Sequence, residues 1–215
     1  WQHLSAAEGL PHPVVRSLFE DHEGTLWVGT DGGGLNRVRR NPFTIQAGSA
    51  GLTIQSVCED QDGGLWFANF GGGLLYKGDG ELKKYGTEQG LLDLNIRSVY
   101  VDRSNTVWVG TTLQGLFFLQ GGTFRRALGQ SGMINPQISA IYEDRSGRLW
   151  LGTARGLVLR EGQGWKFFTT RDGLSANDVR ALADDAEGNL WIGTYRGGLN
   201  CLRDNKFTSF HKSDG

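Results

Sequence analysis

The most conspicuous chemical feature near the start of the chain is a glycine-rich stretch, residues 20–35, EDHEGTLWVGTDGGGL. Its five glycines could form a phosphate-binding loop. Such a loop leads into a helix whose N-terminus faces the anion, and it carries a Lys-Ser/Thr pair or a G-x-G-x-x-G pattern. Neither is present, because LNRVRRNPFTI after Gly34 alternates apolar and basic residues at a strand-like period of two. We therefore interpret the glycines as structural.

Residues suited to catalysis or metal binding are sparse. The four histidines lie near the two ends or in a turn and form no cluster with metal-ligand spacing: His3, His12, His22 and His211. Asp60-x-Asp62-Gly63 resembles the start of a calcium loop, but the later acidic ligands are missing, so turn chemistry explains it better. We predict no catalytic residues, no metal and no cofactor.

The glycine-rich stretch is one copy of a repeat. Similar words occur at residues 59–74, 101–116, 143–157 and 184–199. In all five copies an Asp precedes a Trp by six residues: Asp21 and Trp27, Asp60 and Trp66, Asp102 and Trp108, Asp144 and Trp150, Asp185 and Trp191. The Trp-to-Trp periods of 39, 42, 42 and 41 residues indicate a repeat architecture.

Each period predicts four short strands. In the first copy these are residues 15–21, residues 25–30, LNRVRR and FTIQAG. The turn after the first strand has glycine at Gly24, Gly63, Gly147 and Gly188, and Asn105 in the third copy, which indicates a backbone position with positive φ. Four strands in about 40 residues are typical of a β-propeller blade. The sequence therefore predicts an all-β fold, a β-propeller with five four-stranded antiparallel blades.

The second strands read as continuous apolar runs: LWVG, LWFA, VWVG, LWLG and LWIG. This pattern is expected for sheets buried on both faces by neighbouring blades. We predict that the five tryptophans are core residues, and that the small residue two positions after each leaves room for a large side chain of the adjacent blade.

The repeat boundaries place all 215 residues in a single propeller domain or propeller arc. Trp1 stands eight residues before Gly9, as Phe207 stands eight before Gly215, so residues 1–6 are predicted to form a spare N-terminal outer strand. Either the ring closes at five blades, or the chain is an arc whose apolar end faces favour self-association. The predicted blades span residues 14–46, 53–85, 94–127, 136–170 and 177–211.

The motif DxxGxLWxGTxxGL, repeated in phase over the whole chain, resembles the two-component regulator propeller repeat; Ala68-Asn69 departs from the Gly-Thr of the other copies. The resemblance implies an extracytoplasmic sensor region of a bacterial hybrid histidine kinase or a related signalling protein. It also implies a periplasmic or extracellular location, and contacts with other blades or domains of a parent receptor. Because no signal peptide, transmembrane run or kinase segment is present, we expect an excised piece of such a receptor.

Two alternatives remain open beside ligand sensing: a structural scaffold that binds proteins, and a propeller lyase, because streptogramin lyases share similar Asp-Gly-x-Leu-Trp words.

The composition argues against some binding partners and against a disulfide. With a formal net charge of −1, the chain offers no electrostatic attraction to nucleic acid or to a membrane surface. Cys58 and Cys201 fall three blades apart, so we expect two buried, inert thiols and no disulfide.

Variable loops on a constant scaffold are where recognition is expected. At the start of the first strands, equivalent positions carry Arg16, Gln55, Arg97, Ser139 and Arg180, which would make the mouth of a central channel basic. Inter-blade loops would add His12, Asn95, Asn135 and Asn177. We predict a small polar, anionic or saccharide ligand, held by arginine forks and aromatic stacking. Alternatively, the arginines pair with Asp31, Asp93 and Asp178 and form a solvated rim. The full candidate set is Arg16, Arg97, Arg180, Asp31, Asn69, Phe70, Gln114, Arg155, Tyr195 and Arg196.

Overall fold

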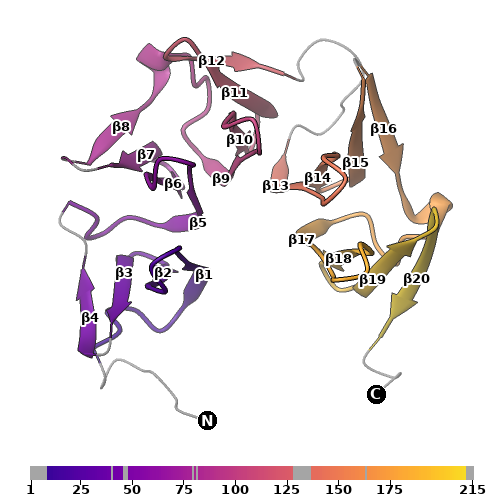
Figure 1. Cartoon of the computed structure of the whole chain (residues 1–215), viewed down its shortest axis with the longest axis horizontal. Helices are drawn as coiled ribbons and strands as arrows, with labels where there is room; N and C mark the ends of the chain where they lie inside the picture. The colour runs from indigo at the N-terminus through magenta and orange to yellow at the C-terminus, as the bar shows by residue number, and fades with distance from the viewer. Residues whose placement is uncertain are drawn as a thin grey trace.

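The structure, a computed structural model, describes residues 9–39, 41–45, 48–78, 80, 82–127, 137–162 and 164–211. Five sheets of four antiparallel strands stand radially around an axis, with the first strand of each sheet innermost (Figure 1). Within each sheet, the strands are ordered as they occur along the chain and each pairs with the next, as in a propeller blade. The predicted all-β propeller with five four-stranded blades is therefore confirmed.

The blades are numbered in chain order. Blade 1 contains β1 (Val15–Glu20), β2 (Leu26–Thr30), β3 (Gly34–Arg39) and β4 (Asn41–Ile45). Blade 2 contains β5 (Ile54–Glu59), β6 (Leu65–Asn69), β7 (Gly73–Lys77) and β8 (Lys83–Tyr85), followed by the short helix η2 (Thr87–Gln89). Blade 3 contains β9 (Ile96–Val101), β10 (Val107–Thr111), β11 (Leu116–Gln120) and β12 (Thr123–Arg126).

The last two blades repeat this order. Blade 4 contains β13 (Ile138–Glu143), β14 (Leu149–Thr153), β15 (Gly156–Glu161) and β16 (Gly164–Phe168), followed by η3 (Thr170–Asp172). Blade 5 contains β17 (Val179–Asp184), β18 (Leu190–Thr194), β19 (Gly198–Arg203) and β20 (Lys206–Phe210). No helix in the described part of the chain is long and apolar enough to span a membrane.

The turn between the first and second strands is fixed by the Asp of each repeat. In blade 3, Asp102 accepts hydrogen bonds from the backbone N–H groups of Ser104 and Thr106, and Trp108 Nε1 donates to its other carboxylate oxygen at 2.7 Å. Asn105 has a φ of 59°, the left-handed conformation predicted from its glycine equivalents. In each of the five blades the Trp indole donates to the Asp six residues earlier, and we call this unit the Asp–Trp staple.

The glycine-rich turn between the second and third strands is also structural. Thr30 donates its hydroxyl to the carbonyl of Gly34 at 2.9 Å, and the equivalent Thr does so in blades 3, 4 and 5. Gly34 has a φ of 79°. A Cβ there would also collide with the Ser49 backbone, so glycine is required on both counts. The N–H groups of Gly34 and Leu35 donate to the Leu52 carbonyl and to Ser49 Oγ, so they are already used within the protein.

Consecutive blades pack through the first strand of the later blade. A Cβ added to Gly110 of blade 3 would lie 2.8 Å from Cβ of Ile138 in blade 4, so the small residue after Trp108 does make room for the neighbouring blade. Four hydrophobic clusters fill the junctions 1/2, 2/3, 3/4 and 4/5. Among the residues that the structure describes, no such cluster joins blade 5 to blade 1.

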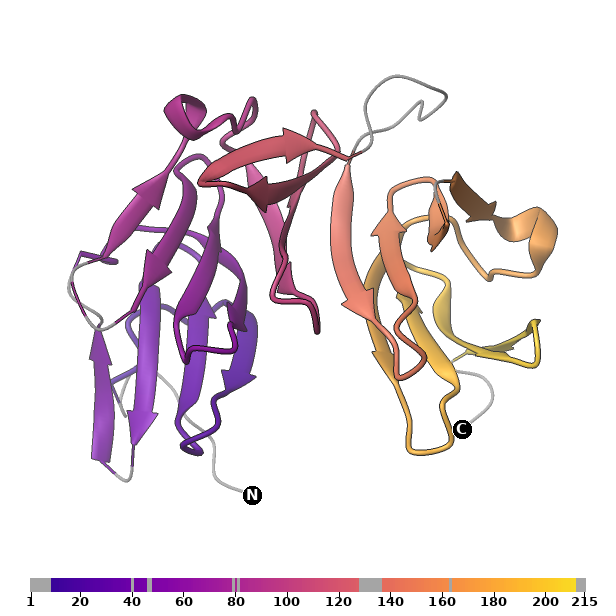
Figure 2. The same ribbon diagram turned by 45° about the horizontal axis from the view of Figure 1, so that its top comes forward.

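The five blades form an arc with an opening between blade 1 and blade 5, which both views show (Figures 1 and 2). Val15 in β1 is 42% exposed, whereas its equivalents Ile54, Ile96, Ile138 and Val179 are all 0% exposed. Leu199 in β19 is 41% exposed, whereas its equivalents Leu35, Leu74, Leu116 and Leu157 are fully buried. We call the side of blade 1 around Val15 and Leu18, and the side of blade 5 around Gly193 and Leu199, the two open faces.

Two sequence-based expectations lie outside the described residues. They are the spare strand at residues 1–6 and the contribution of Asn135 to an inter-blade loop. The two cysteines can be described. Both are free thiols, and burial raises the pKa of Cys58 to about 11 and also raises that of Cys201. Raised pKa values leave little thiolate at neutral pH, which makes both thiols weak nucleophiles.

Candidate ligand site at the channel mouth

A β-bulge places the arginine position at the centre of the arc. In β1 the pairing with β2 shifts between Val15 and Ser17, so Arg16 is the extra residue. The pairing of the first and second strands shifts at the same position in the other four blades. The extra residue there is Arg97 in β9, Arg180 in β17, Gln55 in β5 and Ser139 in β13. Bulges turn a side chain out of the regular strand alternation and commonly occur beside functional sites. This bulge was not predicted from the sequence.

The three arginines differ in their partners. Arg16 pairs with Asp31, and Arg180 Nη2 lies 2.6 Å from Asp178 Oδ2. Arg97 Nε donates to Thr112 Oγ1 at 3.2 Å, and its guanidinium lies over the Phe70 ring, 5.6 Å from the centroid. Within the described ranges no carboxylate lies within 4.0 Å of the Arg97 guanidinium. The rim of ion pairs considered from the sequence therefore forms at two of the three arginines.

Asp93, the third acid of that rim, has other partners. Its carboxylate accepts from the backbone N–H and the side-chain amide of Asn95 at 2.9 and 3.0 Å, and from the backbone N–H of Leu113 at 2.7 Å. It is buried and fixes the loop before β9. The acid that could have neutralised Arg97 is thus used in loop structure.

The electrostatic state of Arg97 follows from these contacts. Burial lowers the pKa of its guanidinium, and the like charges of Arg180 and Arg16 lower it further, whereas Asp178 raises it. By contrast, the hydrogen bond from Arg16 lowers the pKa of Asp31. Arg97 is thus a half-buried cation beside two like charges.

Two aromatic side chains flank these cations. Phe70 lies under Arg97, and Tyr195 has Arg180 and Arg196 over its ring, at 5.4 and 5.0 Å from the centroid. Both rings are exposed. We define the channel mouth as Arg16, Arg97 and Arg180 with Phe70 and Tyr195. Guanidinium groups beside exposed rings can bind an anion and stack on a flat ligand.

The remaining candidates lie around this group with different roles. Asn69 is buried, and its Oδ1 has no hydrogen-bond partner in the described part of the molecule, as is also true of Asp178 Oδ1. Arg155 is exposed, and its backbone N–H donates to Thr153 Oγ1. The side-chain oxygen of Gln114 accepts a hydrogen bond from Arg126 of β12.

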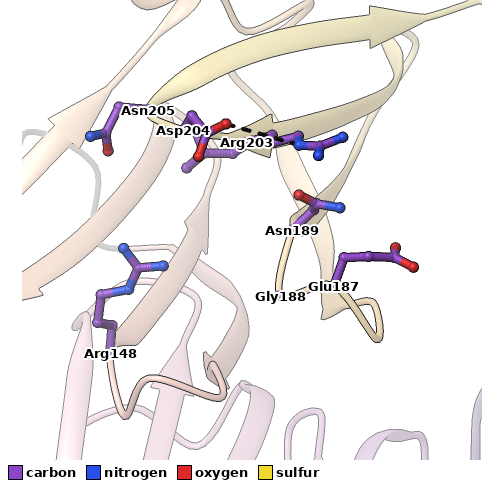
Figure 3. A pocket seen from close by; sticks show the side chains of 8 residues that line it. Arg148, Glu187, Gly188, Asn189, Arg203, Asp204 and Asn205 are labelled. Atoms are coloured by element: carbon purple, nitrogen blue, oxygen red, sulfur yellow. Dashed lines mark ion pairs between the residues drawn. The ribbon is translucent and has the colours of Figure 1, made fainter.

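Hollows also lie at the junctions between blades. One of about 370 Å³ separates Arg148 of blade 4 from the β19–β20 turn of blade 5, where Arg203 faces Asp204 (Figure 3). Two more, of about 320 and 410 Å³, flank Arg160 at the junction of blades 3 and 4. No group of three or more His, Cys, Asp or Glu in the described residues could hold a metal ion.

Solved structures with this fold include receptors and enzymes. The extracellular domain of BT3049 from B. thetaiotaomicron, named as a hybrid two-component system, has a TM-score of 0.85 and 25% sequence identity, over 95% of this chain and 30% of that one. The chain thus spans less than a third of that protein. Virginiamycin B lyase from Staphylococcus aureus has a TM-score of 0.74 at 11% identity, over 94% of this chain and 71% of the lyase.

A third similar structure is PorZ of Porphyromonas gingivalis, described as a surface component of the type-IX secretion system. It has a TM-score of 0.64 at 15% identity, over 95% of this chain and 34% of PorZ. At such identities the lyase and PorZ show a shared fold alone. No curated protein sequence matches this chain significantly.

The family is shown by the repeats themselves. The model of the two component regulator propeller matches residues 9–32, 48–71, 90–112, 132–155 and 173–196, one segment per blade and together more than half of the chain. These segments contain the Asp–Trp staples and the bulged first strands. The chain belongs to the two-component regulator propeller family.

Proposed function

We propose that this chain is a ligand-sensing propeller segment from the periplasmic or extracellular region of a bacterial two-component receptor. Its family and its similarity to the extracellular domain of BT3049 support this role. The single observation that carries the ligand site is Arg97, a half-buried guanidinium without a carboxylate partner in the described residues.

The ligand we propose at the channel mouth is a small polar or saccharide molecule with an anionic group. An anion next to Arg97 would offset both its burial and its repulsion from Arg180 and Arg16. Hydrogen bonds between guanidinium and carboxylate or sulfate are charge-assisted and strong. Phe70 and Tyr195 would stack on the faces of the sugar ring. The role is binding, with no catalytic residue proposed.

The test is calorimetric titration of the wild-type chain with acidic and neutral oligosaccharides, compared with an Arg97→Ala, Arg180→Ala double variant. We expect the acidic ligands to bind and the double variant to lose most of that affinity. Arg171→Ala is the matched control, since it removes an exposed arginine of η3 outside the mouth. The proposal fails if the wild type binds no acidic glycan or if the double variant binds unchanged.

A second role, as part of a larger propeller, is favoured by the two open faces. Val15 and Leu18 on one side, and Leu199 on the other, are exposed at positions that neighbouring blades bury elsewhere in the molecule. We propose that further blades of the same repeat cover these faces in the receptor. The isolated chain would then self-associate through them, and Leu18→Asp combined with Leu199→Asp would reduce its mass in sedimentation velocity. A wild-type chain that stays monomeric at high concentration would contradict this proposal.

A further inference from the structure

A polar contact joins each blade to the next beside the turns that connect the first and second strands. It starts at the residue directly after the Asp of the Asp–Trp staple, whose backbone N–H donates to a side-chain oxygen of the next blade at all four junctions. At junction 3/4, Arg103 donates its backbone N–H to Glu143 Oε2 at 2.8 Å and its Nη1 to the Arg145 carbonyl at 3.0 Å. We call this contact the inter-blade clasp.

The side chain of the donating residue extends the clasp in the same direction. It donates to a backbone carbonyl of the next blade at three junctions: Gln61 to Arg103, Arg103 to Arg145, and Arg145 to Ala186. At junction 1/2 the ring of His22 bonds to Glu59 instead, and this bond raises the pKa of the ring and favours its protonated, donating form. Every clasp therefore has its donors in the earlier blade and its acceptors in the later one.

The acceptor of the backbone N–H is usually the acid directly before the staple Asp of the later blade. This acid is Glu59, Glu143 and Asp184 at junctions 1/2, 3/4 and 4/5. Blade 3 has Val101 at that position, and Asn105 accepts in its place at 3.3 Å. The equivalent acid of blade 1 is Glu20, which is exposed and accepts no hydrogen bond from any residue that the structure describes.

Leu18 lies on the same side of β1 as Glu20, because alternate residues of a strand face the same way. Its equivalents pack in the hydrophobic clusters of the four junctions: Val57, Val99, Ile141 and Leu182. Leu18 itself is 65% exposed. Blade 1 thus presents the apolar residue and the acceptor of a junction, and the donor has to come from a blade that precedes it in space.

Blade 5 of a second copy would be a poor source of that donor. The residue after its staple Asp is Ala186, whose methyl side chain cannot donate a hydrogen bond. Arginine at this position serves both acceptors at junction 4/5: Arg145 Nε lies 3.6 Å from Asp184 Oδ1, and its Nη1 donates to the Ala186 carbonyl at 3.0 Å. The equivalent acceptors in blade 1 are the Glu20 carboxylate and the His22 carbonyl.

We propose that the open face of blade 1 is the docking surface for a blade of the same repeat that carries arginine directly after its staple Asp. This inference rests on the larger propeller proposed above and specifies the chemistry of the blade that adjoins blade 1. Leu18 enters the apolar junction, while the incoming arginine donates to Glu20 and to the His22 carbonyl. Because charge complementarity contributes mainly to specificity, the clasp selects which blade docks and fixes its register.

Two blocked variants of the chain allow docking in one direction only. The donor chain carries Leu18→Asp, which blocks its own blade 1, and the acceptor chain carries Leu199→Asp, which blocks its own blade 5. Ala186→Arg is then added to the donor chain, at an exposed position whose carbonyl can still accept from Arg145. We expect a 1:1 complex in sedimentation velocity, with a dissociation constant about fivefold lower than that of the same pair with Ala186, as for a partly exposed ion pair.

Two controls isolate the clasp from the apolar contact. Ala186→Leu in the donor chain adds apolar area without an N–H donor and should give no gain, and Glu20→Gln in the acceptor chain should remove the gain from Ala186→Arg. The inference is overturned if Ala186→Arg leaves the affinity unchanged, if Ala186→Leu gains as much, or if the gain persists with Glu20→Gln. Association that ignores all three changes would overturn the clasp and leave the larger propeller standing, whereas no association in any combination would overturn both.

Discussion

The inner blades and the end blades have the same internal structure but differ in what surrounds them. Blade 3 and blade 5 share the four-strand order, the bulge at the arginine position and the Asp–Trp staple. They differ at positions that face a neighbour: Trp108 is 4% exposed, whereas Trp191 is only partly buried. Contacts within a blade are therefore set by its own sequence, and contacts between blades require the next repeat.

The largest expected difference concerns these two tryptophans. Trp108→Ala should destabilise the chain by about 3–5 kcal/mol, because truncation leaves a cavity in a packed junction. Trp191→Ala should cost less, about 1–2 kcal/mol, because less area leaves water when the chain folds. Urea unfolding followed by circular dichroism measures both. Equal losses would show that inter-blade burial does not determine the role of this tryptophan.

The first-strand residues that enter the neighbouring blade give a second comparison. Ile138→Ala should cost about 2–5 kcal/mol, because Ile138 is fully buried against Gly110 of the preceding blade. Val15→Ala, the equivalent truncation in blade 1, should change stability by less than about 0.5 kcal/mol, because Val15 is already exposed. A large loss for Val15→Ala would mean that its face is covered in solution, and the effect should then depend on protein concentration.

The small residue two positions after each tryptophan, which is glycine in four blades, sharpens the comparison without removing any side chain. Gly152→Ala should destabilise the chain by about 1–3 kcal/mol, since the atom nearest to the added Cβ would be Val179 Cγ1 of the next blade, 2.8 Å away. Gly193→Ala should be neutral or stabilising, because the nearest atom to its Cβ, in Ala181, is 3.4 Å away and its side of blade 5 is an open face. Thermal unfolding of the two variants under the same conditions measures both effects on stability. A loss of stability in both variants would show that glycine is needed for the strand's own backbone and not for the neighbouring blade.

The repeat made most of the fold predictable. Constant Asp-to-Trp spacing and the Gly/Asn turn position gave the strand number, the blade count and the left-handed turn at Asn105. The hydrogen bond from each indole to its Asp was not predicted, although the constant spacing of six residues was its signal. Spacing alone does not say whether two side chains point toward each other.

The site was less predictable, because it depends on side chains from different blades. The register of the repeat did locate Arg16, Arg97 and Arg180. The register could not tell which of these arginines would form ion pairs. Asp93 was a possible partner of Arg97 from the sequence, but in the structure its carboxylate accepts hydrogen bonds from Asn95 and Leu113. The contact between Arg160 and the Trp108 ring was missed because Arg160 reads as an ordinary exposed strand residue until its position is compared with Leu119 and Leu202 in the neighbouring blades.

The smallest expected effects concern acid stability, where inner and end blades should behave alike. Hydrogen bonds from Asn189 and Trp191 hold the pKa of Asp185 at about 2, and the pKa of Asp144 in blade 4 is also lowered. A lowered folded-state pKa stabilises the protein above the unfolded value near 3.8, and this contribution is lost as the pH falls toward the folded value.

Stability should therefore fall between about pH 4 and pH 2, and Asp144→Asn and Asp185→Asn should each make that fall shallower. Both variants should change the slope, because each Asp–Trp staple lies within one blade and needs no neighbour. Urea unfolding of wild type and both variants at pH 6, 4 and 3 measures the slopes. If only Asp144→Asn changes the slope, the staple depends on a covered blade face, and the separation between contacts within blades and contacts between them is wrong.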